Sequence, residues 1–552
     1  MLLWGHMSSK VAQYLNEHLL GEATTADAVR KHFSTDASLL KIVPDMVVYP
    51  RSTSDVRKVA RFAWQLSEKG HKLPLTARGS GSDTTGAAIG SGVVVNLYAH
   101  LNNILEVDAK QRLIRLQPGV TFKGLNDALA LSGLIVPSYP ATAAYSTIGG
   151  AIANNAAGIL SGAHGTTGAW VGQLEVVLAN GDVMQTGRIS KREVARKKGQ
   201  QDFEGEIYRG IDNLLNDNAE LIASLATTVR DNSGYNIGLV RRKDGSIDLT
   251  PLLVGSQGTL GIISEVIMRA EHRTAEPLVA AIAFTDYDSL HDGLDRLRAL
   301  NPTVLELLDV RLFEYAAERG KKYAFYENVQ AQGDVAAIVL VEFHGHNGRH
   351  KKKAAKQMAK LFKEDAKVTI AFPDQTTTIE DLRILAEVPA VAFMSTKAGE
   401  VAPQLIGGVS IPPEQYERFT QSIYELEKKH HIEIALYGHA SQHVYYARPV
   451  FNLSKVGDRQ RVFKLLSEWS QIVAAHGGHL IGDGGEGRLK APFAYKELDE
   501  ETRELYSAVR AIFDPQNLLN TGVKQTGDLK TLVGALRTDY DDADFAQHAP
   551  SN

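Results

Sequence analysis

Residues 74–92 form a segment rich in glycine, serine and threonine, and these residue types suit the binding of a phosphate anion. Apolar runs at residues 73–75 and 93–95 flank the segment and predict a strand on each side. Glycines let several backbone N–H groups converge on one anion, and the hydroxyls of Ser80 and Ser82 add neutral donors. A flexible surface loop has the same composition, so a binding function needs support from other segments of the chain.

Two later segments have the same character. Residues 147–158 place a small side chain at nearly every position, and a second glycine-containing run follows at 164–167. Residues 253–263 put glycines where a strand is expected, which marks the close approach of a ligand or of another backbone. Small side chains allow a large flat ligand to lie against the backbone. The three segments together predict one site for a large, phosphate-bearing ligand.

Taken in order, these three motifs resemble the FAD-binding domain of the vanillyl-alcohol oxidase / p-cresol methylhydroxylase superfamily, from about residue 43 to about residue 273. Residues 513–522 are similar to the closing motif of that family, in which the chain returns to the FAD domain. The resemblance implies that FAD contacts Arg78, Gly79, Ser80, Gly81, Ser82, Asp83, Pro140, Thr142, Thr147, Gly149, Gly150, Ala153, Asn154, Gly158, His164, Gly165, Thr167, Gln257, Gly261, Ile262 and Asn520.

Two departures from the family pattern lie within these motifs. Some members attach the flavin covalently through a histidine of the first loop, and Ser82 stands at that position here. We therefore expect FAD to be bound noncovalently. Gln257 replaces the glutamate of the third motif, which keeps size and hydrogen bonding but removes a charge.

The second half of the chain resembles the D-lactate and D-2-hydroxyglutarate dehydrogenase branch, first at residues 231–236 and again from residue 437. In metal-dependent members two histidines and a glutamate hold a divalent ion, and a neighbouring histidine is proposed to accept the hydroxyl proton of the substrate. The corresponding residues here are His439, Tyr446 and Asp483, and Gly484 stands in place of the proton acceptor. The substrate half is thus altered where the flavin half is well matched.

These changes predict that the protein holds no catalytic metal. Tyrosine is a poor ligand unless it is deprotonated near its pKa of ~10. His443 could replace it, but the run after it favours a strand, in which residues 439 and 443 would lie roughly 13 Å apart. His479 or Tyr446 could act as the base instead, although His443 and His479 are equally compatible with a role in the cap core. Near the family's substrate-binding arginine, only Lys397 offers a cation.

The elements that must position these residues fall into two patterns. A strand near residues 46–49, a helix after 54, a strand and a glycine-rich loop follow one another before residue 92, which is typical of α/β units. After residue 273, strands and helices alternate as in an α+β cap domain. We expect an α+β fold with a two-subdomain FAD-binding domain and a cap. The boundaries are 1–42 for a helical lead-in, 43–273 for the FAD domain, 274–510 for the cap, 511–525 for the return to the FAD domain and 526–552 for a loose acidic tail.

Composition excludes several classes of function. The net charge of -4 argues against general nucleic-acid binding. The absence of cysteine excludes disulfides, thiolate zinc sites and cysteine-ligated iron–sulfur clusters. No run approaches the ~20 apolar residues of a transmembrane helix. We expect a cytoplasmic protein, and the basic helix predicted over residues 350–362 leaves attachment to a membrane surface open.

The sequence therefore predicts an FAD-dependent dehydrogenase that transfers hydride from a small organic substrate, such as the D-2-hydroxyacid D-lactate, to flavin N5. His439, Tyr446, Asp483 and Lys397 are its expected reaction-site residues. An external quinone or protein would accept the electrons. The alternatives are a metal-independent alcohol or sugar oxidoreductase and a flavin-binding protein that has lost dehydrogenase activity.

Overall fold

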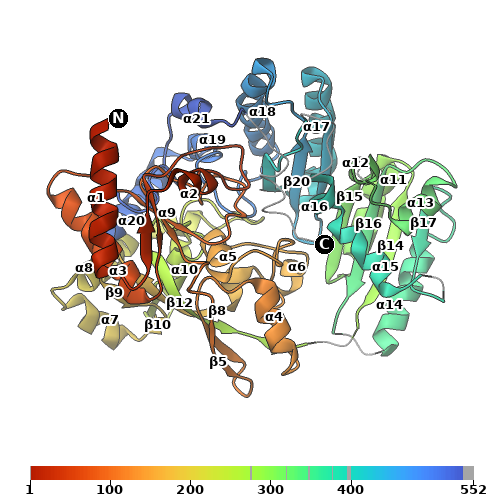
Figure 1. Cartoon of the computed structure of the whole chain (residues 1–552). Coiled ribbons are helices and arrows are strands. Elements are labelled where there is room, and N and C mark those ends of the chain that lie inside the picture. Colours follow the sequence, from red (N-terminus) through yellow and green to blue (C-terminus); the bar gives the residue numbers. More distant parts are fainter. Residues whose placement is uncertain are drawn as a thin grey trace.

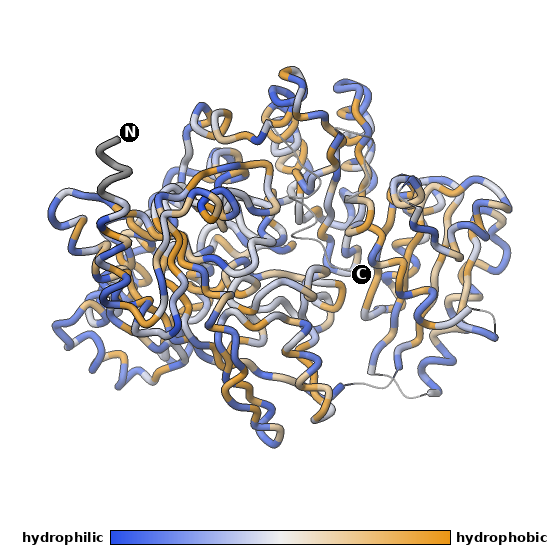
Figure 2. Tube along the Cα trace, viewed as in Figure 1, coloured by the Kyte–Doolittle hydropathy of each residue, from blue (hydrophilic) through white to orange (hydrophobic). Residues whose placement is uncertain are grey.

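The computed structural model describes residues 2–273, 276–318, 320–345, 348–375, 377–393 and 400–538. Figure 1 shows two sheet-containing parts side by side, with the N-terminal half at the left and the cap sheet at the right. Hydrophobic residues concentrate along the inner strands of both parts, whereas the outer helices and loops are mostly hydrophilic (Figure 2). This mixture of helices and sheets agrees with the expected α+β class.

The first sheet of the N-terminal part carries the first glycine-rich loop. Its strands are ordered β1-β2-β4-β3, and β2, β4 and β3 run parallel. Helix α3 covers this sheet because Val56, Val59, Ala60 and Ala63 recur at helical spacing and are buried, and Ser52 caps its first turn. The strands are β1 (Glu22–Thr24), β2 (Met46–Tyr49), β3 (Leu75–Arg78) and β4 (Val93–Asn96), and the helices are α1 (Leu2–His18), α2 (Asp27–His32) and α3 (Thr53–Glu68).

The second sheet carries the other two glycine-rich segments on its connections. Its order is β5-β6-β12-β8-β9, from strands β5 (Ile104–Asp108), β6 (Leu113–Leu116), β8 (Val171–Val177), β9 (Val183–Gln185) and β12 (Ile262–Arg269). Gly181, with φ of 84°, makes the turn between β8 and β9. The helices of this part are α4 (Phe122–Ala130), α5 (Ile148–Asn154), α6 (Ser161–His164), α7 (Lys191–Lys198), α8 (Phe203–Asp217), α9 (Ala219–Ser224) and α10 (Thr250–Leu253).

The cap is one seven-stranded antiparallel sheet of order β17-β14-β16-β15-β19-β20-β18. Its strands are β14 (Leu278–Phe284), β15 (Val304–Asp309), β16 (Ala337–Phe343), β17 (Val368–Ala371), β18 (Ile406–Ser410), β19 (Ile434–His439) and β20 (Val444–Pro449). Its helices are α11 (Tyr287–Arg298), α12 (Val310–Glu318), α13 (Ala324–Gln330), α14 (Gly348–Leu361), α15 (Ile379–Arg383), α16 (Val388–Phe393), α17 (Tyr416–His430), α18 (Val456–Ala475) and α19 (Ala491–Glu497). Strand β14 is apolar throughout and β16 is apolar except for Glu342, because hydrophobic clusters cover both faces of the sheet.

The end of the chain differs from the expected division in two ways. Helix α20 (Glu500–Phe513) packs Leu505, Tyr506, Val509 and Phe513 into the core of the FAD-binding part, so the return to that part begins near residue 499 rather than at 511. Helix α21 (Leu529–Ala535) lies within the segment expected as a loose tail. Its Leu532 is buried in the cap core, because residues 39–40 of the lead-in provide an apolar surface there. The acidic residues 541–544 lie outside the described residues.

The described residues contain no helix whose length and apolar character would let it cross a membrane.

Candidate active site

A cavity of about 1000 Å³ including its mouth lies among the three glycine-rich segments. Its wall comes from the loop after β3, from α5 with the loop before it, and from the turn before β12. Most of the residues that sequence predicted as FAD contacts line it: Arg78, Gly79, Ser80, Gly81, Ser82, Asp83, Pro140, Thr142, Thr147, Gly149, Gly150, Ala153, Asn154, Gln257 and Gly261. The structure therefore brings the three motifs to one place.

The first loop presents backbone donors to this cavity. Within the described part of the chain, the backbone N–H groups of residues 79–84 donate to no protein acceptor. The Arg78 guanidinium instead points behind the loop, where it donates to the carbonyl of Thr35 at 2.7 Å. Burial lowers the pKa of Arg78 to about 10, although the nearby charges of Asp36 and Asp83 oppose that shift. Arg78 thus braces the loop and adds positive charge beneath it.

Close backbone packing explains why glycines occupy this wall. A Cβ atom at Gly79 would lie 2.2 Å from Thr147 Oγ1, and one at Gly149 would lie 2.6 Å from Pro118 Cβ. The glycines therefore let the backbone pack directly against the Thr147 and Pro118 side chains, which leaves a mostly uncharged surface. A cavity with a ring of amide and hydroxyl donors and few large side chains fits a large flat cofactor with phosphate groups, as FAD is.

Six of the predicted contacts do not line the cavity: Gly158, His164, Gly165, Thr167, Ile262 and Asn520. His164 pairs with Glu271 at 3.0 Å, and the Thr167 hydroxyl donates to the carbonyl of Ala156 at 2.9 Å. Asn520 donates to the carbonyls of Ala87 and Gln257, at 2.8 and 2.7 Å. His164, Thr167 and Asn520 thus hold neighbouring segments in place without lining the cavity.

A second cavity, of about 1460 Å³ including its mouth, lies between the FAD-binding part and the cap sheet. Both cavities are lined by the same six residues where they meet: Ser82, Asp83, Pro140, Thr142, Asn154 and Ala156. A ligand that fills the first cavity therefore borders the second. His439, Tyr446 and Asp483 all line this second cavity, whereas Lys397 lies outside the described residues.

His439 ends strand β19 directly opposite Glu306 of β15. This register places the Glu306 carboxylate oxygens 2.7 and 2.8 Å from His439 Nδ1. Burial alone would lower the pKa of His439, but the charge and hydrogen bond of Glu306 outweigh burial and raise that pKa. With Nδ1 engaged, Nε2 is the ring nitrogen left to act on a ligand.

Tyr446 and Asp483 form a second polar group beside His439. The Tyr446 hydroxyl donates to Asp483 Oδ2 at 2.8 Å. The other carboxylate oxygen accepts from the Ala157 backbone N–H at 2.9 Å and from Arg230 at 3.3 Å. Burial, followed by the Asp483 charge, raises the pKa of Tyr446 well above 10. Burial would raise the pKa of Asp483, yet Arg230 and the Tyr446 hydroxyl lower it, so Asp483 is charged and Tyr446 keeps its proton.

Two cations also line the second cavity. Arg448 lies two residues after Tyr446 on the same face of β20, with its guanidinium carbon 5.4 Å from the centre of the Tyr437 ring. Lys490 is 3% exposed, and its Nζ donates to the carbonyl of Gly407 at 2.8 Å. Burial lowers the pKa of Lys490 to about 8. A buried ammonium with one backbone acceptor is well suited to bind an anion.

The other two histidines do not join this group. Residues 439 and 443 are not on one strand, because β19 ends at His439 and a turn leads into β20 at Val444. His443 occupies that turn with φ of 57°, and the charges that act on it are those of Arg298, Glu414 and Asp295 of the cap. His479 lies 3.5 Å from Asp231 and does not line the cavity.

The donor set does not fit the divalent-ion site of the metal-dependent relatives. Among the described residues, no three histidine, cysteine, aspartate or glutamate side chains are grouped as a metal ion requires. Asp483 is committed to Tyr446, Arg230 and a backbone N–H. A protonated tyrosine offers an ion no negative charge. No step of the reaction is therefore assigned to a metal.

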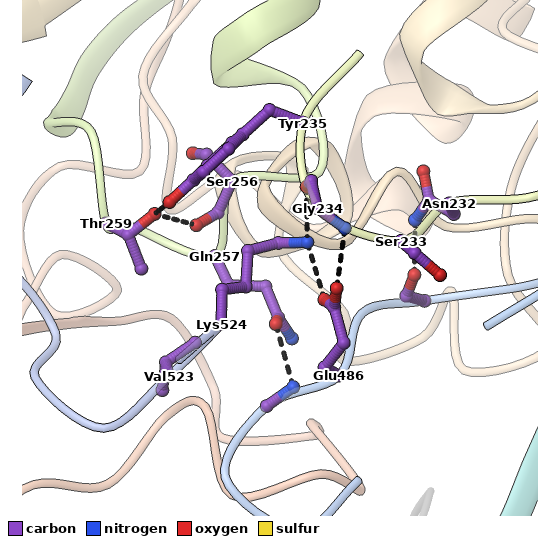
Figure 3. A network of polar contacts seen from close by, with 12 residues as sticks. Asn232, Ser233, Gly234, Tyr235, Ser256, Gln257, Thr259, Glu486, Val523 and Lys524 are labelled. Atoms are coloured by element: carbon purple, nitrogen blue, oxygen red, sulfur yellow. Dashed lines mark hydrogen bonds and ion pairs between the residues drawn. The ribbon is translucent and has the colours of Figure 1, made fainter. Parts of the chain in front are cut away.

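The segment that carries Asp483 and Lys490 is tied to the FAD-binding part by a buried polar network, shown in Figure 3. The side chains of Glu486 and Lys524 are both 0% exposed and form an ion pair at 2.5 Å. Glu486 also accepts from the backbone N–H of Gly234 at 2.6 Å. Gln257 Oε1 accepts from the Gly487 N–H at 2.9 Å, and its amide nitrogen donates to Asn154 at 2.8 Å. A glutamate at position 257 could not make that second bond while ionised.

Sequence reasoning missed Glu306, Arg230, Arg448 and Lys490. Glu306 is an acid between the apolar residues Leu305 and Leu307 of β15, which is a detectable sign of a special role. Arg448 follows Tyr446 at the two-residue spacing that keeps side chains on one face of a strand. Arg230 precedes the 231–236 motif, and Lys490 follows the 477–487 motif by three positions. Apart from this nearness to a motif, the sequence does not indicate a role for either residue.

Comparison with known proteins agrees with this geometry. Residues 44–187 match the FAD binding domain family, and residues 275–523 match the C-terminal domain of FAD linked oxidases. A D-2-hydroxyglutarate dehydrogenase of Pantoea ananatis is 27% identical over 91% of this chain and 50% of its own length. A glycolate oxidase subunit of Bacillus subtilis is 26% identical over 93% of this chain and 96% of its own length. A D-lactate dehydrogenase of Archaeoglobus fulgidus is 27% identical over 86% and 90%, respectively.

The chain spans about half the length of the D-2-hydroxyglutarate dehydrogenases that it matches. Among solved structures, p-cresol methylhydroxylase aligns with 96% of this chain over 98% of its own. The TM-score is 0.70 and the sequence identity is 14%. A 4-ethylphenol oxidase from Gulosibacter chungangensis gives a TM-score of 0.70 at 16% identity, over 95% and 98% of the two chains. At such identities the likeness establishes the fold, including the two-subdomain arrangement expected from the motifs.

Proposed function

The chain is a member of the FAD-linked oxidoreductases, and from this premise we propose that it dehydrogenates a D-2-hydroxyacid and passes the electrons to an external acceptor. The observation that carries the proposal is the His439–Glu306 pair. It stands with buried cations in a cavity continuous with the proposed FAD site. An acid–base group, an anion site and a cofactor site thus meet in one place.

The cations would hold the substrate carboxylate. Lys490 and Arg448 line the cavity, and the buried Lys490 ammonium gains a charged partner when an anion enters. An anion would also raise the pKa of Lys490 from about 8, because its charge favours the protonated amine. We propose that Lys490 and Arg448 orient the substrate, and that Lys397 is a third residue in contact with it.

His439 would act as the general base. Glu306 fixes the ring through Nδ1, so that Nε2 of the neutral imidazole can take the hydroxyl proton of the substrate. The imidazolium that results is stabilised by the Glu306 carboxylate. When bound, FAD supplies the acceptor for the hydride that leaves the same carbon. The substrate thus gives a proton to His439 and a hydride to the cofactor, and it becomes a 2-keto acid.

Tyr446 and Asp483 would orient the substrate rather than accept its proton. The raised pKa of Tyr446 keeps its hydroxyl protonated near neutral pH. Asp483 is held as an anion by Arg230, and it accepts the Tyr446 hydrogen bond. These residues occupy the positions of the relatives' ligands but provide a fixed hydrogen-bond network in place of an ion.

The FAD is proposed to be noncovalent. Ser82 stands where a covalent histidine would be, and its hydroxyl lies 3.2 Å from that of Ser146. Denaturation with acid should release all yellow colour into the supernatant. Flavin that stays with the protein pellet would show that another residue of the cavities forms a covalent bond.

Turnover with a dye acceptor tests the function. We expect reduction of the dye with D-2-hydroxyacids such as D-lactate, and little with L-enantiomers, simple alcohols or sugars. Lys490→Met should raise KM more than it lowers kcat, because it removes a binding charge. Turnover of alcohols or sugars in preference to hydroxyacids would favour the oxidoreductase alternative, and the absence of any turnover would favour a flavin-binding protein.

A further inference from the structure

The second cavity is divided into a charged side and an apolar side. Its charged lining comes from Asp83, Glu306, His439, Arg448, Asp483 and Lys490. Ala386, Pro389 and Ala390 line it from the short helical segment at residues 384–393 of the cap, and Ile159 lines it from the facing FAD-binding part. Within the described lining residues, these two segments contribute no charged side chain.

The helical segment shows why this wall is apolar and shallow. Leu385, Val388 and Ala392 are fully buried in the cap core, so the opposite side of the segment faces the cavity. Ala386, Pro389 and Ala390 occupy that side at helical spacing and are only half-buried. Ile159 across the cavity is half-buried as well. Apolar side chains therefore border a space that small side chains leave open.

Covering this wall with an apolar group of a ligand removes apolar surface from water, which favours binding. It is continuous with the site of Lys490 and His439, so the same molecule can reach both sides of the cavity. A second carboxylate would lose its hydration against these apolar side chains. A substituent as small as the methyl group of lactate would leave most of the wall exposed to water.

We propose that the substrate is a 2-hydroxyacid with an extended apolar substituent, whose carboxylate binds at Lys490 and whose substituent covers Ala386, Pro389 and Ala390. The inference rests on the proposed function and adds the substrate class to it. Ala386 and Ala390 determine specificity through the room that they leave, and they take no part in the chemistry.

A homologous substrate series tests this with the FAD-loaded enzyme and a dye acceptor. D-lactate, D-2-hydroxybutyrate, D-2-hydroxyhexanoate, D-phenyllactate and D-2-hydroxyglutarate would be compared by kcat/KM. We expect kcat/KM to rise roughly fourfold per added methylene group, and D-2-hydroxyhexanoate to exceed D-2-hydroxyglutarate. A flat or falling series, or a preference for D-2-hydroxyglutarate, would overturn the inference while leaving the proposed function intact.

Substitutions that fill the space locate the contact. Ala390→Leu should lower kcat/KM for D-2-hydroxyhexanoate roughly tenfold or more, and leave D-lactate within about twofold. Ala386→Leu provides a second variant if the first fails to fold. Ala317→Leu on the exposed side of α12 is the matched control and should change neither substrate.

Two results would refute the assignment of the wall. An equal loss for both substrates, together with lower FAD content, would mean that the wall faces the cofactor. Unchanged kinetics in both variants would mean that the substituent lies elsewhere. If no hydroxyacid is turned over but an alcohol or sugar is, the proposed function itself fails, and this outcome differs from all the others.

Discussion

At the scale of single residues, the acid–base behaviour of His439 depends on Glu306. The proposed base must be neutral to accept a proton. Burial lowers the pKa of His439, but Glu306 outweighs burial and raises that pKa from its usual value of 6.5. The value of kcat/KM should therefore rise with pH through an apparent pKa above 6.5, and it should fall again as Lys490 loses its proton near pH 8. Glu306→Gln removes the negative charge that raises the pKa of His439, while burial continues to lower that pKa. The rise of kcat/KM should therefore move to lower pH, and the maximal kcat/KM should fall.

The control for this pH profile is a similar pair elsewhere in the cap. Glu468 lies 3.0 Å from His430 Nε2, and neither residue lines the cavity. Glu468→Gln should leave the profile unchanged. A profile that Glu306→Gln does not move would show that His439 is not the titrating base.

Cofactor loading is the second prediction at this scale. A Cβ atom at Gly150 would lie 3.1 Å from Thr147 Oγ1, which the protein can accommodate, so Gly150→Ala should bind FAD. Gly150→Asp adds bulk and negative charge to the wall of the cofactor cavity and should prevent loading. The ratio of flavin to protein absorbance measures both. A flavin-loaded Gly150→Asp protein would mean that the cofactor lies away from α5.

The replaced ligand positions lead to the third prediction. Because Tyr446 and Asp483 bond to each other, elemental analysis of active protein should find no stoichiometric zinc or manganese. A chelator should leave turnover unchanged. One metal ion per FAD, lost together with activity in His439→Ala, would restore the metal-dependent mechanism.

At the scale of elements, the buried Glu486–Lys524 pair holds the segment that carries Asp483 and Lys490. Lys524→Met leaves the Glu486 carboxylate buried without its partner, which should destabilise the protein by about 3–5 kcal/mol. The double variant Glu486→Gln/Lys524→Met should lose less than the sum of the two single changes. The free energy of unfolding in denaturant is the measurement.

Lys322→Met is the matched control for that experiment. Lys322 pairs with Glu327 at 3.4 Å, but the two side chains are 69% and 41% exposed, so little change in stability is expected. A Lys524→Met protein as stable as this control would show that the buried pair does not hold the segment.

The elements also show which features a sequence can predict. The three cofactor loops were predictable because each depends on local residue types, such as the glycines at 79, 149 and 261. Glu306 was not, because its contact with His439 depends on the register of two strands more than 120 residues apart. The turn at residues 440–443 was missed because Tyr445 and Tyr446 favour a strand, and only the pairing of β19 with β20 reveals where the chain reverses.

At the scale of the whole molecule, the proposed active site lies where the FAD-binding part and the cap meet. The FAD-binding part supplies the cofactor cavity and Arg230, and the cap supplies His439, Glu306, Tyr446 and Arg448. The lead-in and the helix α21, which are far apart in sequence, both pack on the cap core and add to the contact between the two parts. The proposed chemistry therefore requires residues of both parts.

Anaerobic reduction of the bound flavin tests the central claim most directly, because it isolates hydride transfer from the unknown acceptor. A D-2-hydroxyacid should bleach the visible absorbance of the wild-type protein, at a rate that rises with pH. His439→Gln should keep its FAD but bleach roughly 10²–10⁴ times more slowly. Failure of every 2-hydroxyacid to bleach the wild-type flavin, or bleaching of the His439→Gln protein at the wild-type rate, would contradict the account.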